Sequence, residues 1–181
     1  TGVDIFSLLR HPSGSLYAGS YSGVYRSTNN GVSWAKANGS AATLAATKVW
    51  CLAVNPSAHI YAGTDIGVFQ STDNGGSWTA ANSGLTNTVV KGLAVNSSGH
   101  VFAATDGGGV FRSTDNGASW RQVNTGLASL ATRCIITHSS GLLYVGTFGG
   151  GVYRSTDNGD TWNALNIGLT DLYEFCFALA P

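Results

Sequence analysis

An octapeptide ending in tryptophan occurs four times in this chain, and it limits the possible folds more than any other feature. Measured between the tryptophans, successive copies are 44, 42 and 42 residues apart. Self-similarity at a period of about 40 residues is typical of arrays in which each unit packs on its neighbours. The sequence therefore predicts four similar units. The copies are 27–34 (STNNGVSW), 71–78 (STDNGGSW), 113–120 (STDNGASW) and 155–162 (STDNGDTW).

Each unit has the pattern of four short β-strands. In the second unit, apolar and β-branched residues fill 49–54, 60–63, 68–71 and 78–81, with Gly, Asn, Asp, Pro and Ser between them. Those residues supply turn geometry, and helical periodicity is absent. Four strands in roughly 42 residues fit a propeller blade better than a solenoid coil. We therefore predict an all-β fold, a β-propeller built of four-stranded antiparallel blades, in which ring closure would protect exposed sheet edges.

The repeats divide the chain into a single propeller segment, 1–181, with units at approximately 1–46, 47–88, 89–130 and 131–172. Residues 173–181 resemble the first strand of a unit and are expected to start a further blade. Three interpretations stay open: a piece of a propeller of about six to eight blades, a chain that assembles with copies of itself, or a chain whose remainder is not represented. We favour the first, because four blades alone would close a very tight ring.

The octapeptide has a local physical explanation. Its acid can accept hydrogen bonds from turn amides, its Asn-Gly pair tolerates positive φ, and its tryptophan can bury against the blade. In the first copy, Asn29 replaces the acid and still offers an acceptor, so we expect that turn to be intact and somewhat weaker. The residues assigned this structural role are Ser27, Asn29, Gly31, Trp34, Ser71, Asp73, Gly75, Trp78, Ser113, Asp115, Gly117, Trp120, Ser155, Asp157, Gly159 and Trp162.

The pattern Ser-x-Asp-x-Gly-x-x-Trp resembles the Asp-box, also called the bacterial neuraminidase repeat, over essentially the whole chain. Proteins with this repeat include sialidases, xyloglucan-degrading glucanases, sortilin-type receptors and photosystem II assembly factors. The resemblance implies a β-propeller in which the boxes lie away from the active face. It implies no single function, because one fold hosts unrelated activities.

A sialidase-like site would need an arginine triad, a tyrosine nucleophile and a glutamate that activates it. The only glutamate is Glu174, in the last expected strand. Arg26, Arg112 and Arg154 occupy one repeat position just before each octapeptide, so we interpret them as surface or turn contacts. The sialidase-like hypothesis is therefore poorly supported.

A xyloglucanase-like site would need two carboxylates facing each other, about 6.5–9.5 Å apart if the mechanism inverts. Asp65 and Asp106 are the only weak catalytic candidates, since both follow a second strand, in Thr-Asp segments. Thr-Asp-Gly is also ordinary hairpin chemistry. We therefore expect a protein without catalytic activity, and part of a glycoside hydrolase is the main alternative.

Equivalent hairpins between the second and third strands carry different residues in different units, namely Tyr21, Asp65, Ile66, Asp106 and Phe148. Aromatic rings and short acids on one rim can stack a sugar and bind its hydroxyls, or dock a protein. We expect a secreted scaffold for carbohydrate or protein binding at these positions. A structural component of a surface assembly is a further alternative, with a homo-oligomer or the rest of a propeller as partner.

The amino-acid composition limits the classes of partner that we expect for this chain. Charged residues make up 10% of the chain, nine basic against nine acidic, so neither nucleic acid nor an anionic membrane surface is an expected partner. No apolar run approaches the roughly 18 residues of a membrane span. The abundance of Gly, Ser, Thr and Asn, with few Lys and Glu, favours an extracellular, cell-surface or periplasmic protein of bacterial origin.

The cysteines and histidines lack the spacing of metal ligands, so we expect no metal and no cofactor. Cys51, Cys134 and Cys176 fall at one repeat position, where the other units carry Ser7 and Gly92. We interpret this position as one that needs a small residue in the innermost strand.

Overall fold

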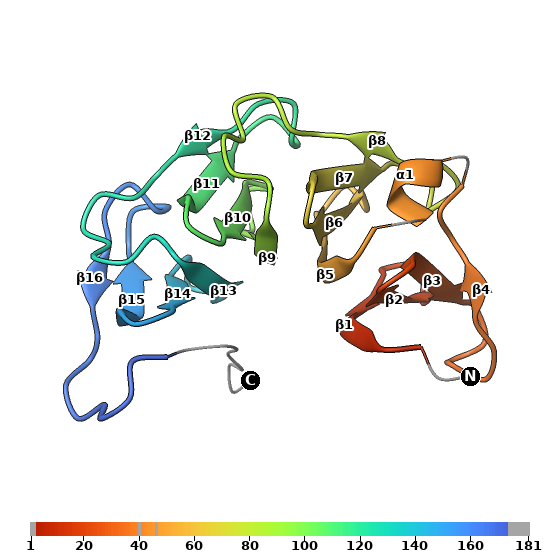
Figure 1. Ribbon diagram of the computed structural model, residues 1–181. Helices are drawn as coiled ribbons and strands as arrows, with labels where there is room; N and C mark the ends of the chain where they lie inside the picture. The colour runs from red at the N-terminus through yellow and green to blue at the C-terminus, as the bar shows by residue number, and fades with distance from the viewer. Residues whose placement is uncertain (1–2, 40, 46, 174–181) are drawn as a thin grey trace.

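The computed structural model describes residues 3–39, 41–45 and 47–173 of the chain. Within that part the chain forms four antiparallel sheets of four strands each, with strand orders that follow the sequence. We call them blades 1 to 4. The sheets stand side by side in an open arch, with β1, β5, β9 and β13 at its inner edge and β4, β8, β12 and β16 outside (Figure 1). The predicted all-β propeller of four-stranded antiparallel blades is confirmed.

The strand bounds of the four blades are as follows. Blade 1 contains β1 (Ile5–Arg10), β2 (Leu16–Ser20), β3 (Gly23–Ser27) and β4 (Ala35–Lys36); blade 2 contains β5 (Val49–Val54), β6 (Ile60–Thr64), β7 (Gly67–Ser71) and β8 (Thr79–Ala80). Blade 3 contains β9 (Val90–Val95), β10 (Val101–Thr105), β11 (Gly109–Ser113) and β12 (Arg121–Gln122); blade 4 contains β13 (Thr132–Thr137), β14 (Leu143–Thr147), β15 (Gly151–Ser155) and β16 (Asn163–Ala164).

One detail differs from the sequence-based expectation. A short helix, α1 (Ala42–Ala45), lies between blades 1 and 2 and buries Leu44 against the core, although no helix was expected. The predicted strand at 173–181 lies outside the described residues apart from Tyr173, which forms an isolated antiparallel bridge with Phe148. In the part of the chain that the structure describes, no helix has the length and apolarity to cross a membrane.

The octapeptide turns of blades 2 to 4 are held by the same hydrogen bonds. In blade 2, Asp73 accepts hydrogen bonds from Ser71 Oγ at 2.9 Å and from the Ser77 amide at 2.7 Å. The Ser77 hydroxyl donates to its other oxygen at 2.7 Å. These hydrogen bonds, above all those from Ser77, lower the pKa of Asp73 from 3.8 to about 2. In blade 1, Asn29 accepts from the Ser27 hydroxyl and the Ser33 amide, both at 2.9 Å, so an amide oxygen serves the same turn.

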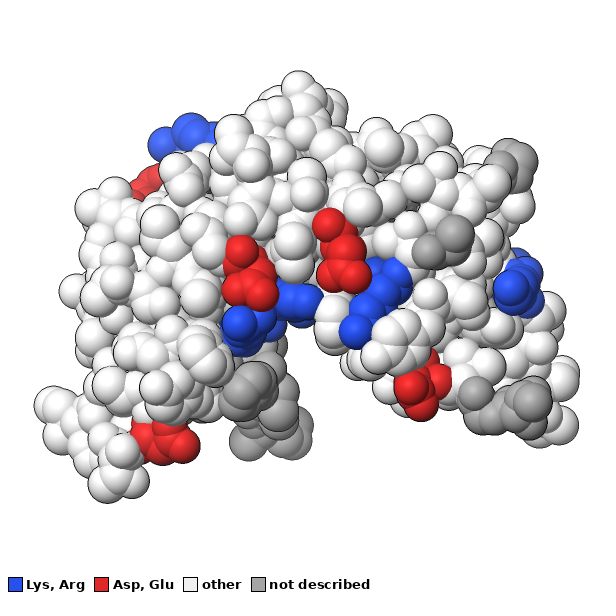
Figure 2. Space-filling model, in the orientation of Figure 1, with Lys and Arg blue, Asp and Glu red and all other residues white. Residues whose placement is uncertain are grey.

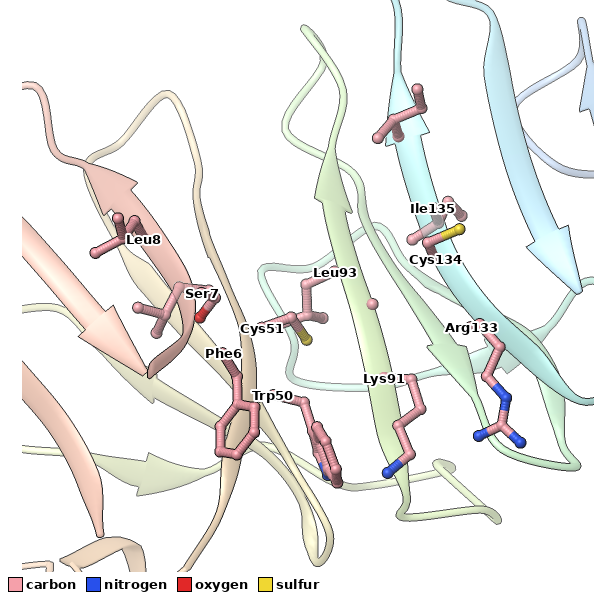
Figure 3. A pocket seen from close by; sticks show the side chains of 13 residues that line it. Phe6, Ser7, Leu8, Trp50, Cys51, Lys91, Leu93, Arg133, Cys134 and Ile135 are labelled. Atoms are coloured by element: carbon pink, nitrogen blue, oxygen red, sulfur yellow. The ribbon is translucent and has the colours of Figure 1, made fainter. Parts of the chain in front are cut away.

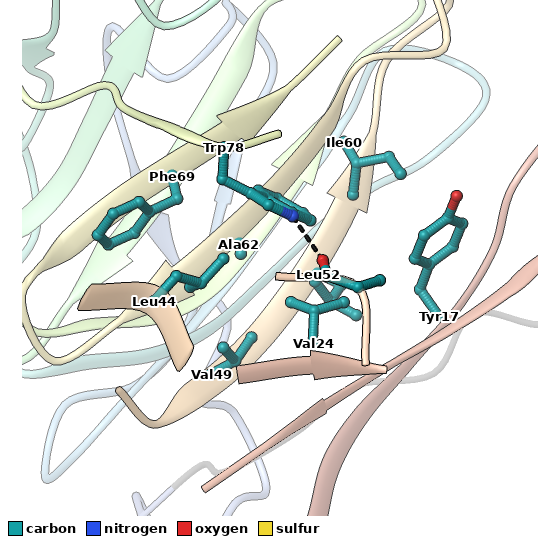
Figure 4. Packing of buried hydrophobic residues seen from close by; sticks show 10 residues of the cluster. Tyr17, Val24, Leu44, Val49, Leu52, Ile60, Ala62, Phe69 and Trp78 are labelled. Atoms are coloured by element: carbon teal, nitrogen blue, oxygen red, sulfur yellow. Dashed lines mark hydrogen bonds between the residues drawn. The ribbon is translucent and has the colours of Figure 1, made fainter. Parts of the chain in front are cut away.

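The tryptophans of blades 2 to 4 join neighbouring blades. The Trp78 indole packs in a buried cluster with Tyr17 and Phe69 and donates its N–H to the Ala37 carbonyl of blade 1 at 2.7 Å (Figure 4). The Trp120 and Trp162 indoles donate in the same way, each to the preceding blade, at 2.8 Å. Apolar clusters that combine residues of adjacent blades form most of the core. Blade stacking, through these indoles, is therefore what buries the sheets.

The innermost two strands of each blade pair small residues. Ser7 faces Gly19 in blade 1, and the corresponding pairs are Cys51 with Gly63, Gly92 with Ala104, and Cys134 with Gly146. A side chain on Gly19 would lie 2.9 Å from the Val49 carbonyl oxygen of the next blade. Where blade 3 carries an alanine on the second strand, its first strand carries a glycine. The small residues therefore let consecutive blades approach closely, and Cys176 lies outside the described residues.

Candidate binding site at the mouth of the central hollow

The first strands of the four blades line a hollow of about 720 Å³, which we call the central hollow (Figure 3). Backbone and side chains of β1, β5, β9 and β13 make its wall, and adjacent first strands are in contact. Cys51 belongs to this wall, and its burial raises the pKa of the thiol to about 12, so the thiol is protonated at neutral pH. The residues lining the hollow are Phe6, Ser7, Leu8, Trp50, Cys51, Leu52, Lys91, Gly92, Leu93, Arg133, Cys134, Ile135 and Ile136.

Each first strand contains a β-bulge at the same repeat position. The pairing with the second strand skips one residue in every blade, and the four skipped residues are Phe6, Trp50, Lys91 and Arg133. A bulge leaves one residue out of the ladder and redirects its side chain. The four side chains lie side by side and point to the same end of the hollow (Figure 3). We call this end the mouth.

At the blade 1 side of the mouth, three aromatic rings surround one lysine. Phe6 contacts Tyr21 edge-on at 4.8 Å between ring centroids and Trp50 at 5.0 Å. Lys48 Nζ lies 4.9, 4.3 and 3.7 Å from the centroids of Phe6, Tyr21 and Trp50. A cation within about 6 Å of a ring face is attracted by the ring quadrupole. Lys48 is therefore held by aromatic rings, while Tyr21 stays 52% exposed to solvent.

Two acids connect consecutive blades at the mouth. Asp65 accepts a hydrogen bond from Trp50 Nε1 at 2.5 Å and lies 3.7 Å from Lys91 Nζ of blade 3. Asp106 of blade 3 accepts from Arg133 Nη1 of blade 4 at 2.6 Å. Burial lowers the pKa of Lys91, and the charges of Asp65 and Asp106 partly oppose that effect. Figure 2 shows these acidic and basic groups gathered at the inner edge of the arch, on a face that is otherwise mostly uncharged.

At the blade 4 side, aromatic residues form a second exposed surface. Phe148 packs edge-on against Tyr173 at 4.6 Å, and the Arg133 guanidinium carbon lies 5.2 Å from the Phe148 ring centroid. Phe148 and Tyr173 are 44% and 52% exposed. The mouth thus carries an exposed aromatic surface at each end, with acids and bases between them.

The structure places all five predicted ligand-binding residues in the hairpins around the mouth. Tyr21 packs on Phe6, which contacts Trp50, and Trp50 donates a hydrogen bond to Asp65. Arg133 contacts both Asp106 and Phe148. Ile66 follows Asp65 and is 43% exposed. Asp65 and Asp106, the weak catalytic candidates, both have cationic partners in the next blade. Both carboxylates therefore take part in contacts between blades.

Sequence reasoning missed the bulge residues and Lys48, which make up much of the mouth. The position before the small residue of the first strand carries Phe6, Trp50, Lys91 and Arg133, four different residues in an otherwise repetitive strand. That variability was the available signal. Arg26 and Arg112, in contrast, bind the Ser15 hydroxyl and the Asn158 carbonyl, beside the turns at the far end of the blades.

Solved structures with the same fold include three informative cases. The extracellular domain of a putative hybrid two-component system from B. thetaiotaomicron is 20% identical over 94% of this chain and 24% of its own, with a TM-score of 0.77. The GH74 xyloglucanase from Xanthomonas campestris is 21% identical over 91% of this chain and 30% of its own, with a TM-score of 0.73. YCF48 bound to D1 peptide is 16% identical over 90% of this chain and 53% of its own, with a TM-score of 0.57.

This chain spans a quarter to a half of the length of those three proteins, and the likeness shows a shared fold. No match was found among curated protein sequences. The model of the DUF6242 beta propeller domain matches residues 35–174, which is more than half of the chain. By its repeats, its four-stranded blades and this match, the chain belongs to the DUF6242 beta propeller domain family.

Proposed function

We propose that this chain is part of an extracellular propeller that binds a carbohydrate or protein ligand at the mouth of the central hollow. The observation that carries this proposal is the set of four bulges, which direct Phe6, Trp50, Lys91 and Arg133 to one end of the hollow. Bulges twist strands locally at a cost to regular pairing and are enriched beside binding sites. The same distortion thus delivers an aromatic ring in two blades and a cation in the other two, a mixture that favours a contact surface at this end.

The chemistry of the mouth suits binding. Exposed aromatic rings supply large contact areas that need little ordering, and the neighbouring acids and bases supply directional hydrogen bonds. Two structural relatives support an extracellular binding role: one is the extracellular domain of a putative hybrid two-component system, and another carries a bound peptide.

The glycoside hydrolase alternative has less support. A hydrolase needs one carboxylic acid to protonate the leaving group and a second carboxylate to activate water or attack the sugar. Asp65 and Asp106 instead contact Lys91 and Arg133. Turnover of xyloglucan by the chain, abolished in Asp65→Asn or Asp106→Asn, would establish the hydrolase in place of the scaffold.

The proposal is tested with the double variant Tyr21→Ala/Phe148→Ala, which truncates an exposed ring at each side of the mouth. The chain and the variant are compared on a glycan and protein array, and the hits are measured by calorimetry. We expect the variant to lose at least about tenfold in affinity, as for aromatic residues central to an interface. Val32→Ala is the control, because Val32 is 85% exposed on an octapeptide turn, away from the mouth. Equal loss in the control, or unchanged affinity in the double variant, would exclude the mouth as the binding site.

A further inference from the structure

Among the described residues, the charged side chains that meet around the four bulge residues include one more cation than anions. They are Lys48, Lys91, Arg133, Asp65 and Asp106, on a chain whose formal net charge is zero. Asp65 pairs with Lys91 and Asp106 with Arg133. Within residues 3–39, 41–45 and 47–173, Lys48 has no ion pair and no hydrogen bond, and its contacts are with aromatic rings. The three N–H donors of its ammonium group are therefore available to hydrogen-bond a ligand.

Two ammonium groups share one indole at this place. Lys48 Nζ and Lys91 Nζ lie 3.7 and 3.3 Å from the Trp50 ring centroid, and the charge of Lys48 contributes to lowering the pKa of Lys91. The two ammonium charges in contact with one ring repel each other, and an added anion would relieve this repulsion. Both the missing partner of Lys48 and this repulsion favour a negatively charged ligand.

The surroundings of Lys48 indicate what kind of anion fits. Tyr21 is 52% exposed beside the ammonium, so a ligand that reaches Lys48 also meets an aromatic surface. Asp65 contacts the Trp50 indole N–H, has a 45% exposed side chain and can accept hydrogen bonds from hydroxyl groups. A sugar ring with a carboxylate meets all three conditions: its C–H face contacts an aromatic ring, its carboxylate pairs with the lysine, and its hydroxyls donate to the acid. An acidic peptide side chain lacks both the ring face and the hydroxyls.

We propose that the mouth binds an acidic glycan, with the carboxylate of a uronic acid residue paired to Lys48. This rests on the proposed binding function and specifies its ligand class. The binding step is a charge-assisted contact: the three rings hold the ammonium in place before the ligand arrives, which reduces the ordering needed on binding. Tyr21 supplies contact area for the sugar ring, and Asp65 positions the Trp50 indole through its hydrogen bond.

The experiment measures binding of oligogalacturonate by calorimetry, with the neutral oligogalactose of the same length and an oligoglutamate peptide as comparisons. We expect oligogalacturonate to bind at least about tenfold more tightly than either, the value of one hydrogen bond to a charged group. The affinity should weaken as salt is raised, because exposed charges are screened. Lys48→Gln should lose at least about tenfold, whereas Lys48→Arg, which keeps a cation over the rings, should retain most of the affinity. Lys36→Gln, on exposed β4, is the matched control and should bind as the parent does.

The outcomes separate this inference from the proposed function. Neutral glycan or oligoglutamate bound as tightly as oligogalacturonate, with affinity lost in Tyr21→Ala/Phe148→Ala, would overturn the acidic-glycan inference and keep the mouth as a binding site. Oligogalacturonate binding that Lys48→Gln and Lys36→Gln leave equally unchanged would overturn it as well. Absence of oligogalacturonate binding to the folded parent chain also overturns the inference.

Discussion

Replacing Trp120 with alanine tests whether the octapeptide tryptophans hold the blades together. Its side chain is 6% exposed and packs between blades 2 and 3, with its N–H bonded to the Ala81 carbonyl. A tryptophan buries roughly 200 Å², which at about 25 cal/mol per Å² corresponds to about 5 kcal/mol as an upper estimate. The lost hydrogen bond adds about 1 kcal/mol. Since some contact area remains and the site relaxes in part, we expect the free energy of unfolding to fall by about 3–5 kcal/mol.

The chain contains a matched control for this substitution. Trp34 occupies the same repeat position in blade 1, but it is 39% exposed and makes no indole hydrogen bond among the described residues. We expect Trp34→Ala to cost only about 1–2 kcal/mol, because less area is buried and no carbonyl loses a partner. Trp120→Phe keeps most of the apolar contact and removes the N–H, so it should cost about 1–3 kcal/mol.

The assay is urea unfolding followed by circular dichroism, which does not depend on the fluorescence of the residue that is replaced. The three variants and the parent are compared at one protein concentration. Equal losses for Trp34→Ala and Trp120→Ala would refute the reasoning, since burial between blades would then make no difference. A loss under about 1 kcal/mol for Trp120→Ala would refute it too.

Two further predictions concern the turns and the small residues. The pKa of Asp73 is held at about 2, below its ordinary value of 3.8, so its hydrogen bonds stabilise the fold above about pH 4 and are lost as the pH falls toward 2. Because the carboxylate is exposed, we expect at most about 1 kcal/mol from it; thermal unfolding between pH 5 and 2 should show a shallower decline in Asp73→Asn, and equal declines would contradict this. Gly19→Ala should destabilise by about 1–3 kcal/mol, because the new methyl carbon would lie 2.7 Å from Ser7 Oγ and 2.9 Å from the Val49 oxygen. Ser7→Gly in the same chain should restore part of the loss, as blade 3 carries glycine and alanine in these places, and a double variant no more stable than Gly19→Ala would contradict the packing explanation.

The sequence by itself determined the blades. The period between Trp34, Trp78, Trp120 and Trp162 and the turn residues between short apolar runs specify local strands and tight corners, and both are short-range properties that the sequence shows directly. The hairpin residues around the mouth could also be found in this way, because equivalent positions of a repeat fall at equivalent places in the fold.

Only the tertiary structure decided what those hairpin residues meet. Asp65 contacts Lys91 and Asp106 contacts Arg133, across the boundaries between blades and 26 and 27 residues apart in the chain. These contacts depend on the β-bulge in each first strand, because skipping one residue in the ladder moves a side chain to the other face of the strand. A β-bulge requires no particular residue type, so the sequence shows only that the residues at this position vary. The structure shows that they lie together at one mouth.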